Sequence, residues 1–363
     1  MRGPICYQMG YTRGVGLFLR QRRGGELPVR LWRMSDPCHG PVAARSTGPS
    51  RACARPPGHV GSPTMSVLVV GSVALDSVRT QSEAHDNLLG GSASYASVAA
   101  SFFGPVRMVG IVGEDFPAAY TDLFASRGID TAGLQRARGR TFAWSGEYEA
   151  NMNNRRTLSV ALNVFETFRP DLPESWRDTE FVLLANIAPA LQHHVLDQMR
   201  RPKFVVADTM DLWIDTTRDD LVRLLGRVDM LILNDGEARQ LTGIDSLPRA
   251  STALRALGPK WLAIKKGEHG CLLFGDGEFF TAGAYPLEEV KDPTGCGDCF
   301  AGGLVGHLAA TGKTDATALR QAVVYGSVIA SFNAESFSLR RLESLAKSHV
   351  DGRFAAFQEF SRF

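Results

Sequence analysis

An aspartate that directly follows a turn of small residues is the part of this sequence best suited to chemistry. Residues 292–303 read DPTGCGDCFAGG, which predicts a strand end, a tight turn and the start of a helix. Unpaired N–H groups and the positive end of the helix dipole attract anions at a helix start, and glycine lets the backbone come close to them. The N–H groups of Gly295, Cys296 and Gly297 could therefore stabilise a phosphoryl group. Asp298 could take the proton of an attacking hydroxyl, or it could simply cap the helix.

Two further motifs place acidic or small residues where apolar runs end. Asp76 comes five residues after Gly71, which ends the first apolar run. Its carboxylate could accept hydrogen bonds from two adjacent hydroxyl groups, although a solvated loop acid is the alternative. The paired glycines Gly90 and Gly91 directly precede a sequence typical of a helix. The order of these motifs, and their positions at strand ends, favour a binding site at one edge of a sheet.

Residues 234–237 read NDGE and follow another apolar run. Asn234 and Glu237 could form a capping box at a helix start. The sequence has no G-x-x-x-x-G-K-[ST] motif, which disfavours a Walker-type nucleotide hydrolase, and no G-x-G-x-x-G after the first apolar run, which disfavours a dehydrogenase.

Short apolar runs alternate with helical stretches, and this alternation predicts the scaffold that brings the motifs together. Buried parallel strands are expected at residues 67–71, 106–112, 181–184, 204–207, 230–233, 261–265 and 271–274. Helices are expected at residues 92–103, 117–126, 191–200, 219–225, 236–242, 251–257, 300–310 and 315–332. Such an order predicts an α/β fold, with a parallel sheet covered on both faces and ligands beyond the carboxyl ends of its strands.

Residues 141–165 break the alternation. Phe142, Trp144 and Tyr148 occupy even positions before an asparagine-rich turn, which indicates a hairpin with one aromatic face. Such a hairpin could leave the sheet and cover a pocket, where Phe142 or Trp144 could stack on a base or on a sugar face. It could equally pack on a core of its own.

The composition is that of an ordinary globular chain, with 363 residues, 44% of them hydrophobic and 21% charged. No apolar run reaches the roughly 18 residues of a membrane-spanning helix. The net charge of +2 is unevenly distributed, because residues 1–64 hold ten arginines and only two acidic residues. The remainder is mildly acidic, so we expect neither a nucleic-acid nor a membrane partner. The six cysteines fit reduced thiols in the cytoplasm, and Cys296 and Cys299 lack a second pair of metal ligands nearby.

In this order the motifs resemble the ribokinase-like, or phosphofructokinase-B (PfkB), family of carbohydrate kinases. DPTGCGDCFAGG resembles the family's C-terminal signature D-T-x-G-A-G-D-x-F, and GGSASYASVAASFFG at residues 90–104 resembles its diglycine signature. NDGE matches the N-x-x-E motif, and KGEHG at residues 266–270 resembles the turn at the nucleotide site. The resemblance covers residues 65–345. It implies a three-layer ribokinase-like sandwich with a mostly parallel central sheet and a small β lid around residues 141–165.

The resemblance also implies an enzyme that transfers the γ-phosphate of ATP to a hydroxyl of a sugar or nucleoside, with Asp298 as general base and Gly295, Cys296 and Gly297 as anion hole. Substrate contacts are implied for Asp76, Gly90, Gly91, Tyr95, Phe142 and Trp144, and the two glycines would also serve as a lid hinge. Nucleotide contacts are implied for Asn234, Glu237, Lys266, Gly267, Gly270 and Ser327. Glu237 would hold Mg²⁺ through water, and Asp292 and Thr294 would hold K⁺, unless Asp292 only caps its own turn.

Departures from the family pattern leave the acceptor open. Tyr95 stands where ribose- and adenosine-phosphorylating relatives often carry an asparagine, and Cys296 replaces the usual alanine. Residues 183–187 lack the glutamate that some sugar kinases carry there. Tyr95 and the aromatic hairpin make a nucleoside kinase a close alternative to a sugar kinase. A non-catalytic sugar- or nucleotide-binding regulator with the same fold is the alternative from another class. Each would bind a small molecule, as a monomer or a homodimer.

The expected domain organisation follows from these patterns. Residues 1–64 are rich in proline and glycine and have no sustained apolar period, so we expect a disordered leader or a misassigned start, with Met65 as the true first residue. A targeting peptide is the alternative, because the segment is rich in arginine and poor in acids. Residues 65–350 would form the kinase domain with its lid, and residues 351–363 a tail.

Overall fold

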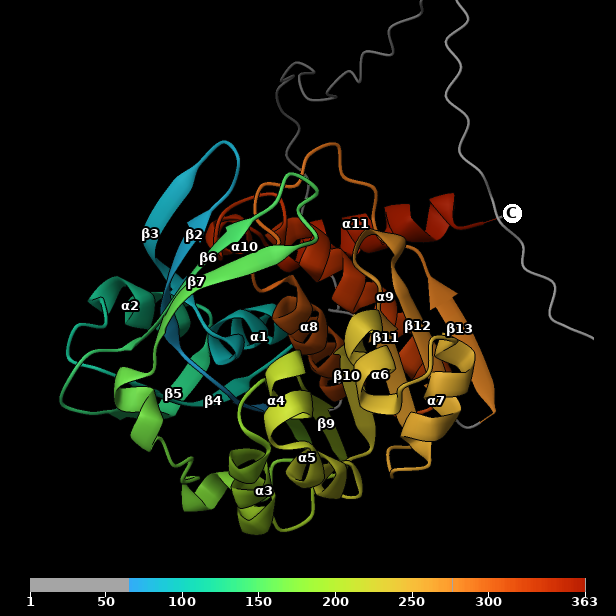
Figure 1. Ribbon diagram of the computed structural model, residues 1–363, viewed down its shortest axis with the longest axis horizontal. Coiled ribbons are helices and arrows are strands. Elements are labelled where there is room, and N and C mark those ends of the chain that lie inside the picture. The colour runs from blue at the N-terminus through green and yellow to red at the C-terminus, as the bar shows by residue number, and fades with distance from the viewer. Residues whose placement is uncertain (1–64, 276, 363) are drawn as a thin grey trace, which may run out of the picture. The chain divides into compact units, whose positions relative to one another are not determined.

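The computed structural model describes residues 65–275 and 277–362 (Figure 1). The chain divides into two units, Met1–His59 and Val60–Phe363, and only the second contains described residues. The predictions for residues 1–64 therefore lie outside the described part of the chain. Among the helices of the described part, none is both long enough and apolar enough to cross a membrane.

The large sheet has nine strands in the order β13-β12-β11-β10-β9-β8-β1-β4-β5. The strands are β1 (Val67–Val70), β4 (Val106–Val112), β5 (Ile129–Arg136), β8 (Phe181–Leu184), β9 (Phe204–Asp208), β10 (Met230–Asn234), β11 (Trp261–Lys265), β12 (Cys271–Gly275) and β13 (Glu278–Ala282). Every pair from β11 to β5 is parallel. The prediction of a mostly parallel central sheet is therefore confirmed, and β1 and β8 are buried along their whole length because helices cover both faces.

The expectation that residues 271–274 form a parallel strand is wrong, because β12 pairs antiparallel with β11. A single short 3-10 turn, Gly267–His269, joins the two strands. A parallel neighbour needs a crossover of roughly a dozen residues or more, and this connection is far too short for one. β13 continues the antiparallel edge of the sheet.

Helices cover both faces of the large sheet (Figure 1). One face carries α1 (Ser92–Ser101), α2 (Ala118–Ser126), α8 (Cys296–Thr311), α9 (Ala316–Asn333), α10 (Arg340–Glu343) and α11 (Lys347–Phe360). The other carries α3 (Pro189–Gln198), α4 (Asp211–Thr216), α5 (Arg218–Leu225), α6 (Asp235–Thr242) and α7 (Leu247–Arg255). Val67 and Val69 of β1 belong to the first core, and Leu68 and Val70 to the second, because successive side chains of a strand point to opposite faces. The predicted three layers are thus confirmed.

Each predicted helix overlaps an observed one, with shifted ends. α8 begins at Cys296, four residues before the predicted start, so the residues of the anion turn lie in its first turn. The apolar patterns do not predict α4 or α11. The expected tail boundary at residue 350 lies inside α11, whose Val350 and Phe357 are buried.

A second sheet of four strands has the order β3-β2-β6-β7 and lies at the upper left of Figure 1. Its strands are β2 (Ala74–Arg79), β3 (Ala84–Gly90), β6 (Phe142–Tyr148) and β7 (Arg155–Ala161). β6 and β7 form the hairpin predicted within residues 141–165. β2 pairs antiparallel with β3 and parallel with β6, and this second pairing sets Asp76 opposite Trp144. The small sheet therefore joins the Asp76 strand to the aromatic hairpin.

The close packing of α8 on α1 yields a prediction about stability. A Cβ on Gly302 of α8 would collide with the carbonyl oxygen of Ala96 in α1. Gly302→Ala should therefore lower the free energy of unfolding by about 1–3 kcal/mol, as overpacking of a core does. Gly352 of α11 has no neighbour within 4 Å of its Cβ position, so Gly352→Ala should instead raise it by about 0.5–1 kcal/mol. Denaturant unfolding of both variants tests this, and effects of the same sign would contradict the packing argument.

Candidate active site

The first turn of α8 lies between two cavities. One, which we call the Asp76 cavity, has a volume of about 510 Å³, and its walls include Asp76, Gly295 and Asp298. The other, which we call the Lys265 cavity, has a volume of about 500 Å³, and Cys296 and Gly297 belong to its walls. Because adjacent residues of one turn face different cavities, a group bound in one would approach a group bound in the other at this turn.

The residues singled out in the sequence divide between these cavities. The Asp76 cavity is lined by Asp76, Gly91, Tyr95, Phe142, Trp144, Thr294, Gly295 and Asp298. The Lys265 cavity is lined by Gly267, Gly270, Cys296, Gly297 and Ser327. Gly90, Asn234, Glu237, Lys266 and Asp292 line neither of the two. The acceptor-side residues implied by the family resemblance thus line the Asp76 cavity, except Gly90, whereas Gly267, Gly270 and Ser327 are the only nucleotide-side residues that line the Lys265 cavity.

Asp76 lies on β2 and is buried against the diglycine turn. A Cβ on Gly90 would collide with the Asp76 carboxylate, so only glycine leaves room for that carboxylate. The N–H group of Gly91 donates to the carboxylate, and Gly91 has a φ of 89°, which suits glycine. Burial, together with the charges of Asp292 and Asp298, raises the pKa of Asp76 to about 8.

Asp298 occupies the third position of α8. Burial, together with the carboxylate of Asp208, raises its pKa to about 7 against the opposing effect of Lys265 and Arg155. A carboxyl group with a pKa near 7 can exchange a proton at neutral pH, which is the property a general base needs. The environment of Asp298 therefore goes beyond that of an ordinary helix cap.

The backbone of the α8 turn offers N–H groups to an anion. The N–H of Cys296 donates to the carbonyl oxygen of Pro293 at 3.2 Å, so it already has a partner. The N–H groups of Gly295 and Gly297 are then the donors that remain available to a ligand. Gly295 has a φ of 75°, and a Cβ there would collide with the ring of Tyr95. Tyr95 is fully buried, and its ring packs against the turn at Gly295.

Asp292 caps the turn that precedes α8. Its Oδ1 accepts the N–H of Thr294 at 2.9 Å, and its Oδ2 accepts the N–H of Ser338 at 3.2 Å. Thr294 in turn donates its hydroxyl to the Tyr148 hydroxyl at 3.2 Å. Both carboxylate oxygens are thus engaged in holding the loop, which fits the turn-capping alternative, while a K⁺ site at Asp292 and Thr294 stays a prediction.

The capping box at the start of α6 is present as the sequence predicts. Asn234 Oδ1 accepts the N–H of Glu237 at 2.8 Å, and Glu237 Oε2 accepts the N–H of Asn234 at 2.7 Å. Burial raises the pKa of Glu237 to about 7. Within residues 65–275 and 277–362, three or more His, Cys, Asp or Glu side chains are nowhere arranged to hold a metal ion. A role of Glu237 toward Mg²⁺ stays a prediction.

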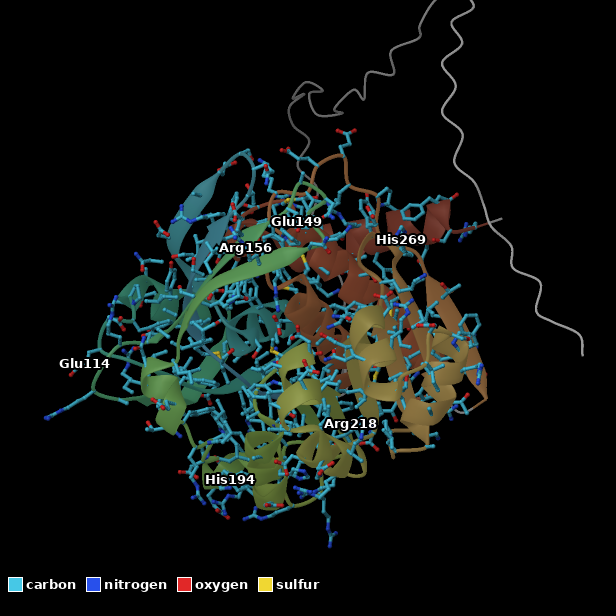
Figure 2. All side chains as sticks on the ribbon, in the orientation of Figure 1. Glu114, Glu149, Arg156, His194, Arg218 and His269 are labelled. Carbon is cyan, nitrogen blue, oxygen red and sulfur yellow. The ribbon has the colours of Figure 1, made fainter. Side chains whose placement is uncertain are left out.

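The β6–β7 hairpin forms one wall of the Asp76 cavity. Phe142 stacks on Phe165 with ring centroids 5.3 Å apart, and Trp144 donates its indole N–H to Thr157 at 3.3 Å. The guanidinium of Arg155 lies 5.7 Å from the Trp144 ring centroid. Figure 2 shows Glu149 and Arg156 of this hairpin in the upper part of the view, at a similar height to His269 of the β11–β12 connection.

The hairpin also reaches the Lys265 cavity through its turn. Asn151, Met152 and Asn153 line that cavity, and Asn153 Nδ2 donates to Glu268 Oε1 at 3.3 Å. One hairpin therefore contributes to the walls of both cavities.

Comparison with known proteins decides the family. The family described as "pfkB family carbohydrate kinase" matches this chain over residues 65–339. The chain belongs to this family. It is a phosphotransferase with a ribokinase-like fold, as the motifs predict.

This pfkB-family chain is similar in sequence to a cytidine kinase from Thermococcus kodakarensis, with 29% identity over 249 residues, which are 66% of this chain and 87% of the relative. Its structure resembles a Burkholderia thailandensis nucleoside kinase in complex with inosine, with a TM-score of 0.65, 19% identity and coverage of 80% of this chain and 98% of that one. It also resembles a Ribokinase II from E. coli in complex with ATP and Mg²⁺, with a TM-score of 0.67, 17% identity and coverage of 80% and 99%. These structures share its fold.

Sequence reasoning misses several residues at the two cavities of this pfkB-family chain. Lys265 lines a cavity where the motif singles out Lys266, and its Nζ lies 3.4 Å from Asp208 Oδ1. Trp213 donates its indole N–H to Asn186 Oδ1 at 2.8 Å, and both line the Asp76 cavity. Lys265 and Asp208 are polar residues that end apolar strands, and that position is the signal that could have found them.

The raised pKa of Asp76 predicts a pH-dependent effect on stability. The folded protein holds this carboxyl protonated up to about pH 8, against 3.8 for the ordinary group. The ionised carboxyl therefore costs stability, and this cost grows from about pH 4 until it is complete above pH 8. Asp76→Asn should raise Tm by a few degrees at pH 9 and change it little at pH 4.

Thermal unfolding at both pH values tests the Asp76 prediction. Asp86 on the neighbouring strand β3 is exposed, so Asp86→Asn is the matched control and should leave Tm unchanged at both. A Tm gain for Asp76→Asn that is equal at the two pH values would contradict the argument from burial.

Proposed function

We propose that this protein transfers the γ-phosphate of ATP to a hydroxyl group of a sugar or nucleoside, with Asp298 as the general base. The observation that carries the proposal is the position of the first turn of α8, with Asp298 facing the Asp76 cavity and Gly297 facing the Lys265 cavity. An acceptor in the first cavity and ATP in the second would meet at this turn. The arrangement favours direct transfer between the two ligands.

The chemistry of the step follows from the groups at the turn. A hydroxyl is a poor nucleophile near neutral pH, so a carboxylate within reach must take its proton as attack proceeds. The new bond joins the acceptor oxygen to the γ-phosphorus, the bond from that phosphorus to the bridging oxygen of ADP breaks, and the proton passes to Asp298. The N–H groups of Gly295 and Gly297 and the helix dipole would stabilise the charge on the transferred group.

The nucleotide would occupy the Lys265 cavity, whose walls include the turn residues Gly267 and Gly270 and, on α9, Ser327. Mg²⁺ neutralises charge on the phosphates when it is bound. Glu237 could meet this requirement through water, because only its Oε2 accepts the N–H of Asn234 and the charge of Lys265 reaches it from the same cavity. Mg²⁺ needs only one or two protein carboxylates beside water and phosphate.

Aromatic walls favour a nucleoside as the acceptor. Phe142 and Trp144 line the cavity from the hairpin, and Trp213 lines it from α4. A base could stack on these rings, while Asp76 could accept hydrogen bonds from two ribose hydroxyls. Relatives described as a cytidine kinase and as a nucleoside kinase in complex with inosine point to the same class of acceptor.

A coupled assay of ADP release tests the proposed reaction. Nucleosides, pentoses and hexoses serve as acceptors, and we expect turnover to be highest with a nucleoside. Asp298→Asn should lower kcat by at least about a hundredfold and leave ATP binding nearly intact, because only the proton acceptor is lost. In the wild type, kcat should fall as the pH drops through about 7, since a protonated Asp298 cannot accept a proton.

Asp315→Asn is the control for the role of Asp298. Asp315 caps α9 by accepting the N–H of Ala318 at 3.1 Å and lines neither cavity. Its replacement should cost about 1 kcal/mol of stability at most and leave kcat unchanged. If Asp298→Asn changes only stability, as expected of Asp315→Asn, Asp298 is a helix cap and the proposal is wrong.

The hairpin would act as a lid over the acceptor. Water competes with the acceptor for the γ-phosphate, so a kinase gains by covering the acceptor before transfer. Trp144→Ala should raise the KM for the acceptor, leave the KM for ATP nearly unchanged, and increase ATP hydrolysis relative to transfer. Leu158 lies on the same hairpin, is 43% exposed and lines neither cavity, so Leu158→Ala is the control. Equal KM values for acceptor in wild type and Trp144→Ala would rule out the lid.

A further inference from the structure

Lys265 is a largely buried cation in the wall of the Lys265 cavity, next to the first turn of α8. It is the last residue of β11, and its side chain, 19% exposed, lines the Lys265 cavity. A Cβ on Gly297 would lie 3.0 Å from its Nζ, so the ammonium group lies directly against the first turn of α8. The absence of a side chain at Gly297 is what leaves this approach open.

The ammonium group has more hydrogen-bonding capacity than its neighbours use. An ammonium carries three donors. Within the described residues, Lys265 Nζ makes a single hydrogen bond, a long one of 3.4 Å to Asp208 Oδ1. The ammonium group lies next to Gly297, and both residues line the same cavity. An anion bound there would receive hydrogen bonds from both the helix start and the lysine.

The charges around Lys265 explain why a cation is needed at this point. Carboxylates face it from β9, α6 and α8, namely those of Asp208, Glu237 and Asp298. Burial alone would lower the pKa of Lys265, but these carboxylates outweigh burial and raise it. The lysine therefore stays protonated. Lys265 is the only lysine or arginine among the described residues that line this cavity, so without it no cationic side chain of the wall would offset the nearby carboxylates when a polyphosphate binds.

We propose that Lys265 binds the γ-phosphate of the nucleotide and remains on the phosphoryl group during transfer, giving up its long hydrogen bond to Asp208. The inference rests on the proposed function and assigns a further residue to it. Lys265 gives no proton in this step. The proton of the acceptor hydroxyl goes to Asp298, and the electron pair of the broken bond stays on the bridging oxygen of ADP. A lysine suits this task as a compact point charge on a flexible stem, which can follow the phosphorus.

A purely structural role is the alternative, in which Lys265 only neutralises the buried Asp208. The two roles differ in what they require of the nucleotide. A γ-phosphate contact discriminates nucleoside triphosphate from diphosphate, whereas neutralisation of Asp208 affects the binding of both alike. The ratio of the two dissociation constants therefore separates the roles, and it needs no acceptor turnover.

The experiment measures Kd by calorimetry for ADP and for the β,γ-imido analogue of ATP, both with Mg²⁺. Lys265→Met should weaken binding of the triphosphate about ten- to a hundredfold and change ADP binding less than threefold. It should lower kcat by at least the same factor as it weakens triphosphate binding. Lys265→Arg should retain part of the discrimination. Lys203 bonds the carbonyl of Gly312 at the amino end of β9, away from both cavities, so Lys203→Met is the matched control and should behave as the wild type.

The double variant Lys265→Met/Asp208→Leu tests the alternative directly and guards against misfolding of the single variant. If neutralisation of Asp208 is the only role, the ratio of the two dissociation constants keeps its wild-type value in the single and the double variant alike, and the proposal is overturned. If Lys265 binds the γ-phosphate, the double variant still fails to distinguish the two nucleotides. A wild-type protein that discriminates them but phosphorylates no acceptor would contradict the proposed function and leave the assignment of Lys265 standing.

Discussion

The site depends on how closely the first turn of α8 approaches the ring of Tyr95. Gly295 has a φ of 75°, and a Cβ at this position would collide with the ring of Tyr95. Asp292 holds the preceding loop with both carboxylate oxygens, one on Thr294 and one on Ser338. Tyr95 and Asp292 thus fix the turn, whose Gly295 and Gly297 line the two cavities. Preorganised N–H donors do not need to reorient when charge develops.

Negative charge is concentrated around this turn. Burial raises the pKa of Asp76, Asp298 and Glu237, while the cations that face them are Lys265 and Arg155. Carboxyl groups held in such surroundings lower the stability of the fold, and active sites commonly carry costs of this kind. The excess of carboxyl groups also explains why an anionic ligand needs both a helix start and a lysine here.

Much of the fold could be predicted because the central strands, such as β1 and β8, are continuous apolar runs. β2 and β5 could not be predicted in this way, because buried and exposed residues are mixed along them and they contain no continuous apolar run. Asp298 and its glycines could be found because they are contiguous in sequence. Lys265 and Asp208 are 57 residues apart, and only the parallel order of the sheet brings them together. Which of two adjacent lysines enters the cavity depends on the direction of side chains at the end of β11, which a motif cannot specify.

The parallel pairing of β2 with β6 has a mechanical consequence. Asp76 and Trp144 are direct partners in that pairing, so the residue proposed to hold the acceptor hydroxyls and the residue proposed to cover the ring lie on hydrogen-bonded strands of one sheet. Any rotation of the small sheet would carry both of them relative to Asp298. A bound acceptor would then move together with the small sheet towards the base. This differs from a fixed cleft that a separately moving lid closes.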